Sequence, residues 1–185
     1  MLKFIVNDGF IEMASKILTG QETNQNEKVS NDLNSLLLLV ELQEAKLYVV
    51  PKVYEEIVDH SKNDNGQAKD FMEKYCVPCE LNYDDQILAE NLAYNYGNAK
   101  VGRLPPIQDA KTEKSKFYNK AIIVAQESVA TEILGGKVIT LTDYYHYKID
   151  IPSINVINER FGLPPLTVYN RTAIDEAIQD SGKEL

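Results

Sequence analysis

Short apolar segments that alternate with longer segments of helical periodicity constrain this chain more than any other feature. The apolar segments are residues 2–6, 46–50, 76–81, 137–141 and 166–169. Helical spacing covers residues 8–18, 30–44, 51–61, 67–75, 83–96, 116–134, 153–161 and 171–179. Strands buried on both faces are continuously apolar, so this alternation predicts a parallel sheet between helices. We expect a three-layer α/β/α fold around a mainly parallel sheet of four to five strands.

The composition predicts one globular domain over residues 1–185. The chain has 185 residues, of which 44% are hydrophobic, and this is enough for one proper core. No internal repeat or low-complexity linker interrupts it. The net charge of −9 argues against passive binding of a polyanion, because attraction to phosphate needs local Lys and Arg. Action on nucleic acid through metal ions held by carboxylates remains compatible with this charge.

The sequence also predicts the cellular location of the protein. It contains no apolar run of about 18 residues, so we expect no membrane span. The first residues form a strand candidate without the features of a secretion signal. Two cysteines are too few for a disulfide scaffold, and Cys76 and Cys79 lie within a strand candidate rather than at the helix start that a redox pair needs. The expected location is the cytoplasm, with two ordinary cysteines.

Three acids lie next to the ends of predicted strands or early in the helices that follow. Asp8 follows the first apolar segment and either caps the next helix or belongs to a site. Glu56 lies on the same side of its helix as Val53 and Ile57, where a metal or the helix N-terminus accounts for it equally well. Asp143 follows segment 137–141, and a turn role is the alternative. Converging carboxylates suit Mg²⁺ or Mn²⁺, which can activate water against a phosphodiester.

Three motifs follow one another along the chain: KFIVNDGFIE, LYVVPKVYEEI, and NKAIIVAQESVA followed by KVITLTD. With these motifs in this order, the chain resembles a PIN domain, the small α/β fold of many metal-dependent ribonucleases, including toxins of toxin–antitoxin pairs. The motifs span about residues 2–147, and we expect residues 148–185 to pack on the same domain as a C-terminal extension. The resemblance implies a Mg²⁺- or Mn²⁺-dependent endoribonuclease. The family carries acids after the first and fourth strands, in the helix after the second strand, and at the start of the late helix.

This chain departs from the PIN pattern at the functional positions. Asn7 stands where the family has its first Asp, with Asp8 one residue later, and Asn119 stands where the late helix should begin with Asp. After the fourth strand, the matching residue is Asp143 or Thr142. The implied catalytic residues are therefore Asp8, Glu56 and Asp143, and the implied metal ligands are these three with Asn7 and Asn119.

The departures leave two functions open. Asp8, Asp109, Glu113 or Glu127 can fill the missing acid positions by a shift in register, which would give an active ribonuclease. Alternatively, the asparagines bring no charge and weaken metal binding. The chain would then be a weakened PIN-like module that binds RNA or protein, as in a toxin–antitoxin or phage-defence system.

A basic stretch flanks the start of the late helix in this otherwise acidic chain. We expect Arg103, Lys114, Lys116 and Lys120 to contact RNA, although lysines that keep a loop soluble explain the stretch equally well. The family analogy adds an antitoxin-like protein partner and a homodimer as expected partners.

Overall fold

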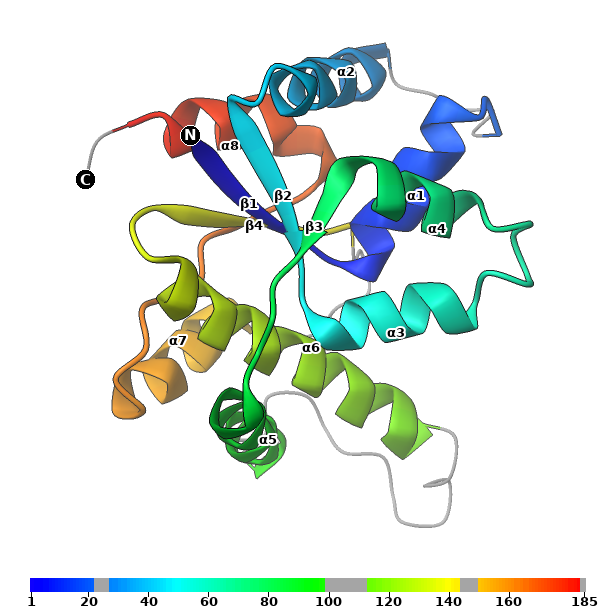
Figure 1. Cartoon of the computed structure of the whole chain (residues 1–185). Coiled ribbons are helices and arrows are strands. Elements are labelled where there is room, and N and C mark those ends of the chain that lie inside the picture. The colour runs from blue at the N-terminus through cyan, green and yellow to red at the C-terminus, as the bar shows by residue number, and fades with distance from the viewer. Residues whose placement is uncertain (22–26, 99–112, 144–149, 184–185) are drawn as a thin grey trace. The chain divides into compact units, whose positions relative to one another are not determined.

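The computed structural model describes residues 1–21, 27–98, 113–143 and 150–183 (Figure 1). The strands are β1 (Leu2–Val6), β2 (Ala45–Val49), β3 (Cys76–Pro78), β4 (Val138–Leu141) and β5 (Val168–Tyr169). The helices are α1 (Asp8–Leu18), α2 (Glu27–Glu41), α3 (Pro51–Asp59), α4 (Gln67–Tyr75), α5 (Tyr83–Asn98), α6 (Glu113–Leu134), α7 (Ile151–Arg160), the short 3₁₀ helix η2 (Arg171–Ala173) and α8 (Ile174–Ser181).

Within the described residues, the strands form one five-stranded sheet in the order β3-β2-β1-β4-β5, and every neighbouring pair is parallel. In the central strand, Ile5 pairs with Tyr48 of β2 on one side and with Thr140 of β4 on the other. Phe4, Ile5 and Val6 are all 0% exposed. Because consecutive residues of a strand point to opposite faces of the sheet, both faces are covered at β1, as its continuous apolar sequence predicts. The predicted α/β/α fold with a mainly parallel sheet of four to five strands is confirmed.

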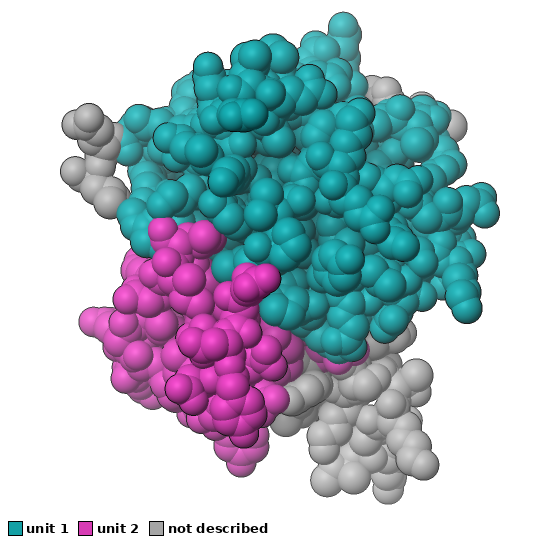
Figure 2. Space-filling view, in the orientation of Figure 1, with its two compact units in different colours: residues 1–79, 135–145, 167–185 teal, residues 80–134, 146–166 magenta. Residues whose placement is uncertain are grey.

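The chain divides into two compact units, which Figure 2 distinguishes by colour. The first unit consists of Met1–Cys79, Gly135–Tyr145 and Thr167–Leu185 and contains the sheet with α1, α2, α3, α4, η2 and α8. Within it, α1 packs against α3 and α4, while α2 packs against α8. The second unit consists of Glu80–Leu134 and His146–Leu166 and contains α5, α6 and α7. The expectation of one domain over residues 1–185 stays a prediction.

A buried polar network holds the second unit together. The Tyr96 hydroxyl of α5 donates to Oδ1 of Asn158 in α7 at 2.5 Å and lies 3.2 Å from Oγ of Ser128 in α6. Asn158 Nδ2 donates to Ser128 Oγ at 3.0 Å, and Ser128 Oγ donates to the Val124 carbonyl at 2.9 Å. All three network side chains are 0% exposed. Because each buried polar group has a partner, the network fixes the three helices against one another.

Several boundaries differ from the sequence expectation by a few residues, and two of these differences, in α2 and β3, have a local backbone reason. Helix α2 was expected over residues 30–44, but it spans Glu27–Glu41. It ends there because Gln43 adopts a left-handed conformation with φ of 59°, and the Glu44 N–H bonds back to the Leu39 carbonyl at 2.9 Å. Strand β3 ends at Pro78, three residues short of the expected segment 76–81. Proline supplies no N–H to a ladder and is suited to the edge position that β3 occupies.

No helix in the described ranges combines the length and apolarity needed to span a membrane.

Candidate functional site

The parallel sheet gathers several predicted site residues at its carboxyl edge. Asn7 and Asp8 follow β1, Thr142 and Asp143 follow β4, and Arg171 comes two residues after the end of β5. Strands β1, β4 and β5 are direct neighbours in the sheet. In parallel sheets this edge is where ligand sites are built, so the environment of each side chain decides what the edge can do.

Asn7 is the N-cap of α1, the role that the sequence left open for Asp8. Its Oδ1 accepts a hydrogen bond from the Phe10 N–H at 3.0 Å, and its Nδ2 donates to Thr142 Oγ1 at 2.6 Å. The side chain is buried, with 3% exposure. Both ends of the Asn7 amide therefore join β1, β4 and α1, and this position has a structural use that does not require a metal.

Asp8 is the first residue of α1 and has an unusual carboxyl group. Its Oδ1 is buried and accepts no hydrogen bond from any residue that the structure describes. Burial raises the pKa of Asp8 from 3.8 to about 6. The negative charges of Glu12 and, more weakly, Glu56 act in the same direction, while the backbone N–H groups of Asp8 and Gly9 oppose the shift. Asp8 is thus a carboxylate in an acidic and poorly solvated place, which favours neutralisation by a proton or a cation.

Glu56 comes from α3, the helix that follows β2, and lies partly covered with a side-chain exposure of 19%. Lys52 Nζ is 3.4 Å from Oε1 of Glu56, and His60 Nδ1 is 3.8 Å from its Oε2. These neighbours stand one turn before and one turn after Glu56, so they hold its carboxylate from two sides. Its effect on the pKa of Asp8 places the two acids in electrostatic range.

Asp143, predicted as a catalytic residue and metal ligand, lies in an ion pair. Arg171 Nε donates to Asp143 Oδ1 at 2.6 Å, and Arg171 Nη2 donates to Oδ2. The side chains are 20% exposed for Arg171 and 9% for Asp143. A bidentate guanidinium already supplies the positive charge that a metal would bring to this carboxylate. Sequence reasoning did not single out Arg171, although its position just after the last strand was a usable signal.

The late-helix residues belong to the second unit. Asn119 and Lys120 lie in α6, half-buried, and Glu127 is a buried residue of the same helix, with 3% exposure. Lys114 and Lys116 also fall in α6, but their side chains lie outside the described residues.

The other residues predicted near the late helix lie wholly or partly outside the described residues. Arg103 and Asp109 lie entirely outside the described residues, and Glu113 is described only as the first residue of α6. The predicted RNA-contacting role of the basic stretch and the ligand role of Asn119 therefore stay predictions.

Glu12 is a second residue, besides Arg171, that the sequence analysis missed. It follows Asp8 by one helical turn, and a spacing of four residues on α1 was the signal that could have identified it. Among the described residues, no three His, Cys, Asp or Glu side chains lie close enough to hold a metal ion together. The acidic site is thus the pair Asp8 and Glu56 with Glu12 alongside.

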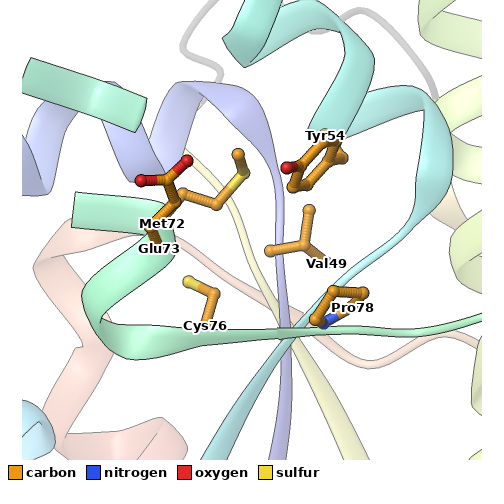
Figure 3. A pocket seen from close by; sticks show the side chains of 6 residues that line it. All are labelled: Val49, Tyr54, Met72, Glu73, Cys76 and Pro78. Atoms are coloured by element: carbon orange, nitrogen blue, oxygen red, sulfur yellow. The ribbon is translucent and has the colours of Figure 1, made fainter. Parts of the chain in front are cut away.

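One of the two cysteines, Cys76, borders a separate small hollow of about 210 Å³ in the first unit. Figure 3 shows the side chains that line it, which are Val49, Tyr54, Met72, Glu73, Cys76 and Pro78. Neither cysteine forms a disulfide, Cys79 is 5% exposed, and burial raises the pKa of the Cys76 thiol to about 12. A thiol with so high a pKa forms little thiolate near neutral pH, so this pair does not have the chemistry of a redox motif.

Comparisons of this chain with protein-family models, with curated proteins and with solved structures find no match.

Proposed function

We propose that this protein is a divalent-cation-dependent ribonuclease of PIN type, with Asp8 and Glu56 as the carboxylates that bind Mg²⁺ or Mn²⁺. The observation that carries the proposal is the buried Asp8 Oδ1, which has no hydrogen-bond donor among the described residues and lies in the field of Glu12 and Glu56. Such a group lowers its free energy by binding a cation. The strand-end position of Asp8 and the resemblance to PIN domains support the same reaction class.

The residues present fit a hard divalent cation. Mg²⁺ commonly binds through one or two carboxylates, retains several waters and takes further oxygens from a substrate phosphate. Asp8 and Glu56 supply that number of carboxylates. Asp143 is not needed, because it is paired with Arg171, and Asn7 is not needed, because it caps α1. When bound, the cation would polarise the scissile phosphate and generate hydroxide from water.

The chain's own residues prepare this site. The N-cap bond from the Phe10 N–H to Asn7 fixes the first turn of α1 and therefore the backbone that carries Asp8. Lys52 and His60 flank the carboxylate of Glu56 and restrict where it points. Burial keeps water away from Asp8 Oδ1, which strengthens its attraction for a cation over that of an exposed carboxylate.

The test is calorimetric titration of Mn²⁺ into the wild type, Asp8→Asn, Glu56→Gln and Glu55→Gln. Glu55 is the matched control because it neighbours Glu56 on α3 but is 60% exposed. We expect saturable binding that both Asp8→Asn and Glu56→Gln abolish and Glu55→Gln preserves. Cleavage of RNA should follow the same order, with Glu56→Gln purified in parallel to exclude a contaminating nuclease. Equal Mn²⁺ binding by the wild type and Glu56→Gln would refute the proposal.

A second candidate is favoured by Asn7 and by the ion pair of Asp143. Because these two positions are committed to the fold, the same structure suits a PIN-like module that binds RNA or an antitoxin-like protein without cutting. Metal-dependent RNA cleavage that is lost in Glu56→Gln would exclude this candidate. Binding of RNA without cleavage, and without Mn²⁺ affinity, would favour it over the enzyme.

A further inference from the structure

A polar hollow of about 220 Å³ lies in the first unit, beside the acidic site. Its lining residues are Glu12, Ser15, Lys16, Gln21, His60, Asn63, Asp64 and Gln67. They come from α1, from the segment after it, from the turn between α3 and α4, and from the first residue of α4. The volume is below the roughly 300–1,000 Å³ of pockets for drug-sized ligands, so the hollow suits a small planar group rather than a whole nucleotide.

Two residues connect the polar hollow with the acidic site. Glu12 lines the hollow, and its charge raises the pKa of Asp8. His60 also lines it and is tied to Glu56, since His60 Nδ1 is 2.8 Å from the Glu56 carbonyl oxygen. Both residues stand one helical turn after a proposed cation ligand. A substrate whose phosphate lies at Asp8 and Glu56 would therefore have a neighbouring group within reach of the hollow.

The lining has the chemistry to read the edge of a base. Gln21, Asn63 and Gln67 each offer one amide acceptor and two donors, the pattern with which Asn and Gln recognise bases. The Glu12 carboxylate lines the hollow and can accept a hydrogen bond from an exocyclic amino group. The tethered imidazole of His60, whose side chain is 58% exposed, offers a face for stacking.

The charge of the lining excludes a phosphate from the hollow itself. Glu12 and Asp64 bring two carboxylates against one ammonium group from Lys16. Asp64 is fixed in place, because its Oδ1 accepts from the Gly66 N–H at 3.0 Å and its Oδ2 from the Ala68 N–H at 3.2 Å. An uncharged group that donates hydrogen bonds fits this environment, whereas an anion is repelled.

We infer that the polar hollow is a nucleobase subsite that prefers adenine, cytosine or guanine over uracil, because the exocyclic amino group of these three bases can donate to Glu12. As a subsite of the RNA substrate, the inference rests on the proposed ribonuclease function. Gln67 and Asn63 would contact the base edge, and uracil would bind more weakly because its carbonyl oxygen faces the carboxylate. The subsite would give the cleavage reaction a base preference.

The test is an NMR titration of the wild type with adenosine, cytidine and uridine in the absence of divalent cations. Nucleosides lack phosphate, so any binding reports on the base and ribose alone. The variants are Asn63→Ala and Gln67→Ala, and Asn34→Ala on the exposed side of α2 is the matched control. We expect millimolar binding of adenosine or cytidine that each variant at the hollow weakens about fivefold or more. Asn34→Ala should bind like the wild type, and uridine should bind more weakly.

Three results would overturn the subsite: no saturable binding of any nucleoside, equal binding by the wild type and both hollow variants, or tighter binding of guanidinium ion than of nucleosides. The Mn²⁺ titration separates this failure from that of the proposed function. Mn²⁺ binding that needs Asp8, together with no nucleoside binding, refutes only the subsite. Nucleoside binding with no Mn²⁺ binding refutes the ribonuclease and leaves a base-binding site.

Discussion

Arg171 binds both carboxylate oxygens of Asp143, through Nε to Oδ1 at 2.6 Å and through Nη2 to Oδ2. Asp143 follows β4 and Arg171 begins η2 just after β5, so the pair joins the ends of two adjacent parallel strands. The acid that the resemblance to PIN domains assigns to the metal is therefore paired with a cation from the chain itself. Because the pair predicts a structural role for Asp143 and the resemblance predicts a metal-binding role, an experiment can distinguish the two.

Asp143→Asn should destabilise the protein and leave Mn²⁺ binding intact. The substitution removes a charge-assisted, partly buried pair and leaves Arg171 without that carboxylate, which costs about 1.5–3 kcal/mol. Urea denaturation measures the loss, and the double variant Asp143→Ala with Arg171→Ala should lose less than the sum of its single variants. If Asp143→Asn instead abolished Mn²⁺ binding at unchanged stability, Asp143 would be a metal ligand that Arg171 releases.

Asn7→Ala should cost about 2–3 kcal/mol of unfolding free energy, because it removes the N-cap of α1 and the bond to Thr142 together. Asn7→Asp keeps an oxygen for the Phe10 N–H and should lose less than Asn7→Ala in urea denaturation. It also places a second acid beside Asp8, as the PIN pattern has at this position, so its Mn²⁺ affinity should exceed that of the wild type. A stability of Asn7→Ala within about 0.5 kcal/mol of the wild type would show that the cap is dispensable.

The strand positions could be predicted because a buried parallel strand must be continuously apolar, and the helices α1 and α4 have the bounds that their periodicity indicated. Their ends are marked in the sequence by turn residues, such as Asn7 before α1 and Gly66 before α4. The end of α2 could not be predicted in this way, because it depends on a left-handed Gln43, and glutamine is not a residue that usually marks such a turn.

The candidate site was predicted only in part, for a physical reason. The topology of a parallel sheet places residues after β1 and β4 at one edge, so Asp8 and Asp143 could be named from their positions. Which groups neutralise them depends on contacts between distant residues. Arg171 lies 28 residues from Asp143, and nothing in the local pattern of either segment specifies the pair. The pattern also could not show that Asn7 uses both ends of its amide within the fold.

Tyr96→Phe should destabilise the protein by about 1–3 kcal/mol, because it leaves the buried Asn158 Oδ1 without its donor. Tyr94→Phe is the matched control: it makes the same chemical change on the same helix at a side chain that is 70% exposed. Urea denaturation of both variants should show the loss for Tyr96→Phe alone. Equal stabilities would mean that Ser128 and Asn158 satisfy each other without the tyrosine.

The partly buried Asp8 should make the unfolding free energy fall as the pH rises from about 4 to about 6. Its folded pKa of about 6 lies above the unfolded value of 3.8, so in this interval the folded protein binds more protons than the unfolded chain. The unfolding free energy therefore decreases as the pH rises. Once Asp8 is ionised in both states, above about pH 6, the contribution levels off at a loss of up to about 3 kcal/mol.

Asp8→Asn removes the ionisable group and should therefore stabilise the protein above pH 6, with no gain below about pH 4. Urea denaturation at a series of pH values measures this difference. Asp84→Asn is the control, because Asp84 also lies in the first turn of a helix but is exposed. It should give no gain at any pH. Saturating Mn²⁺ should reverse the order above pH 6, since only the wild type would bind the ion and be stabilised by it. A pH-independent difference between Asp8→Asn and the wild type would contradict the raised pKa and weaken the proposed cation site with it.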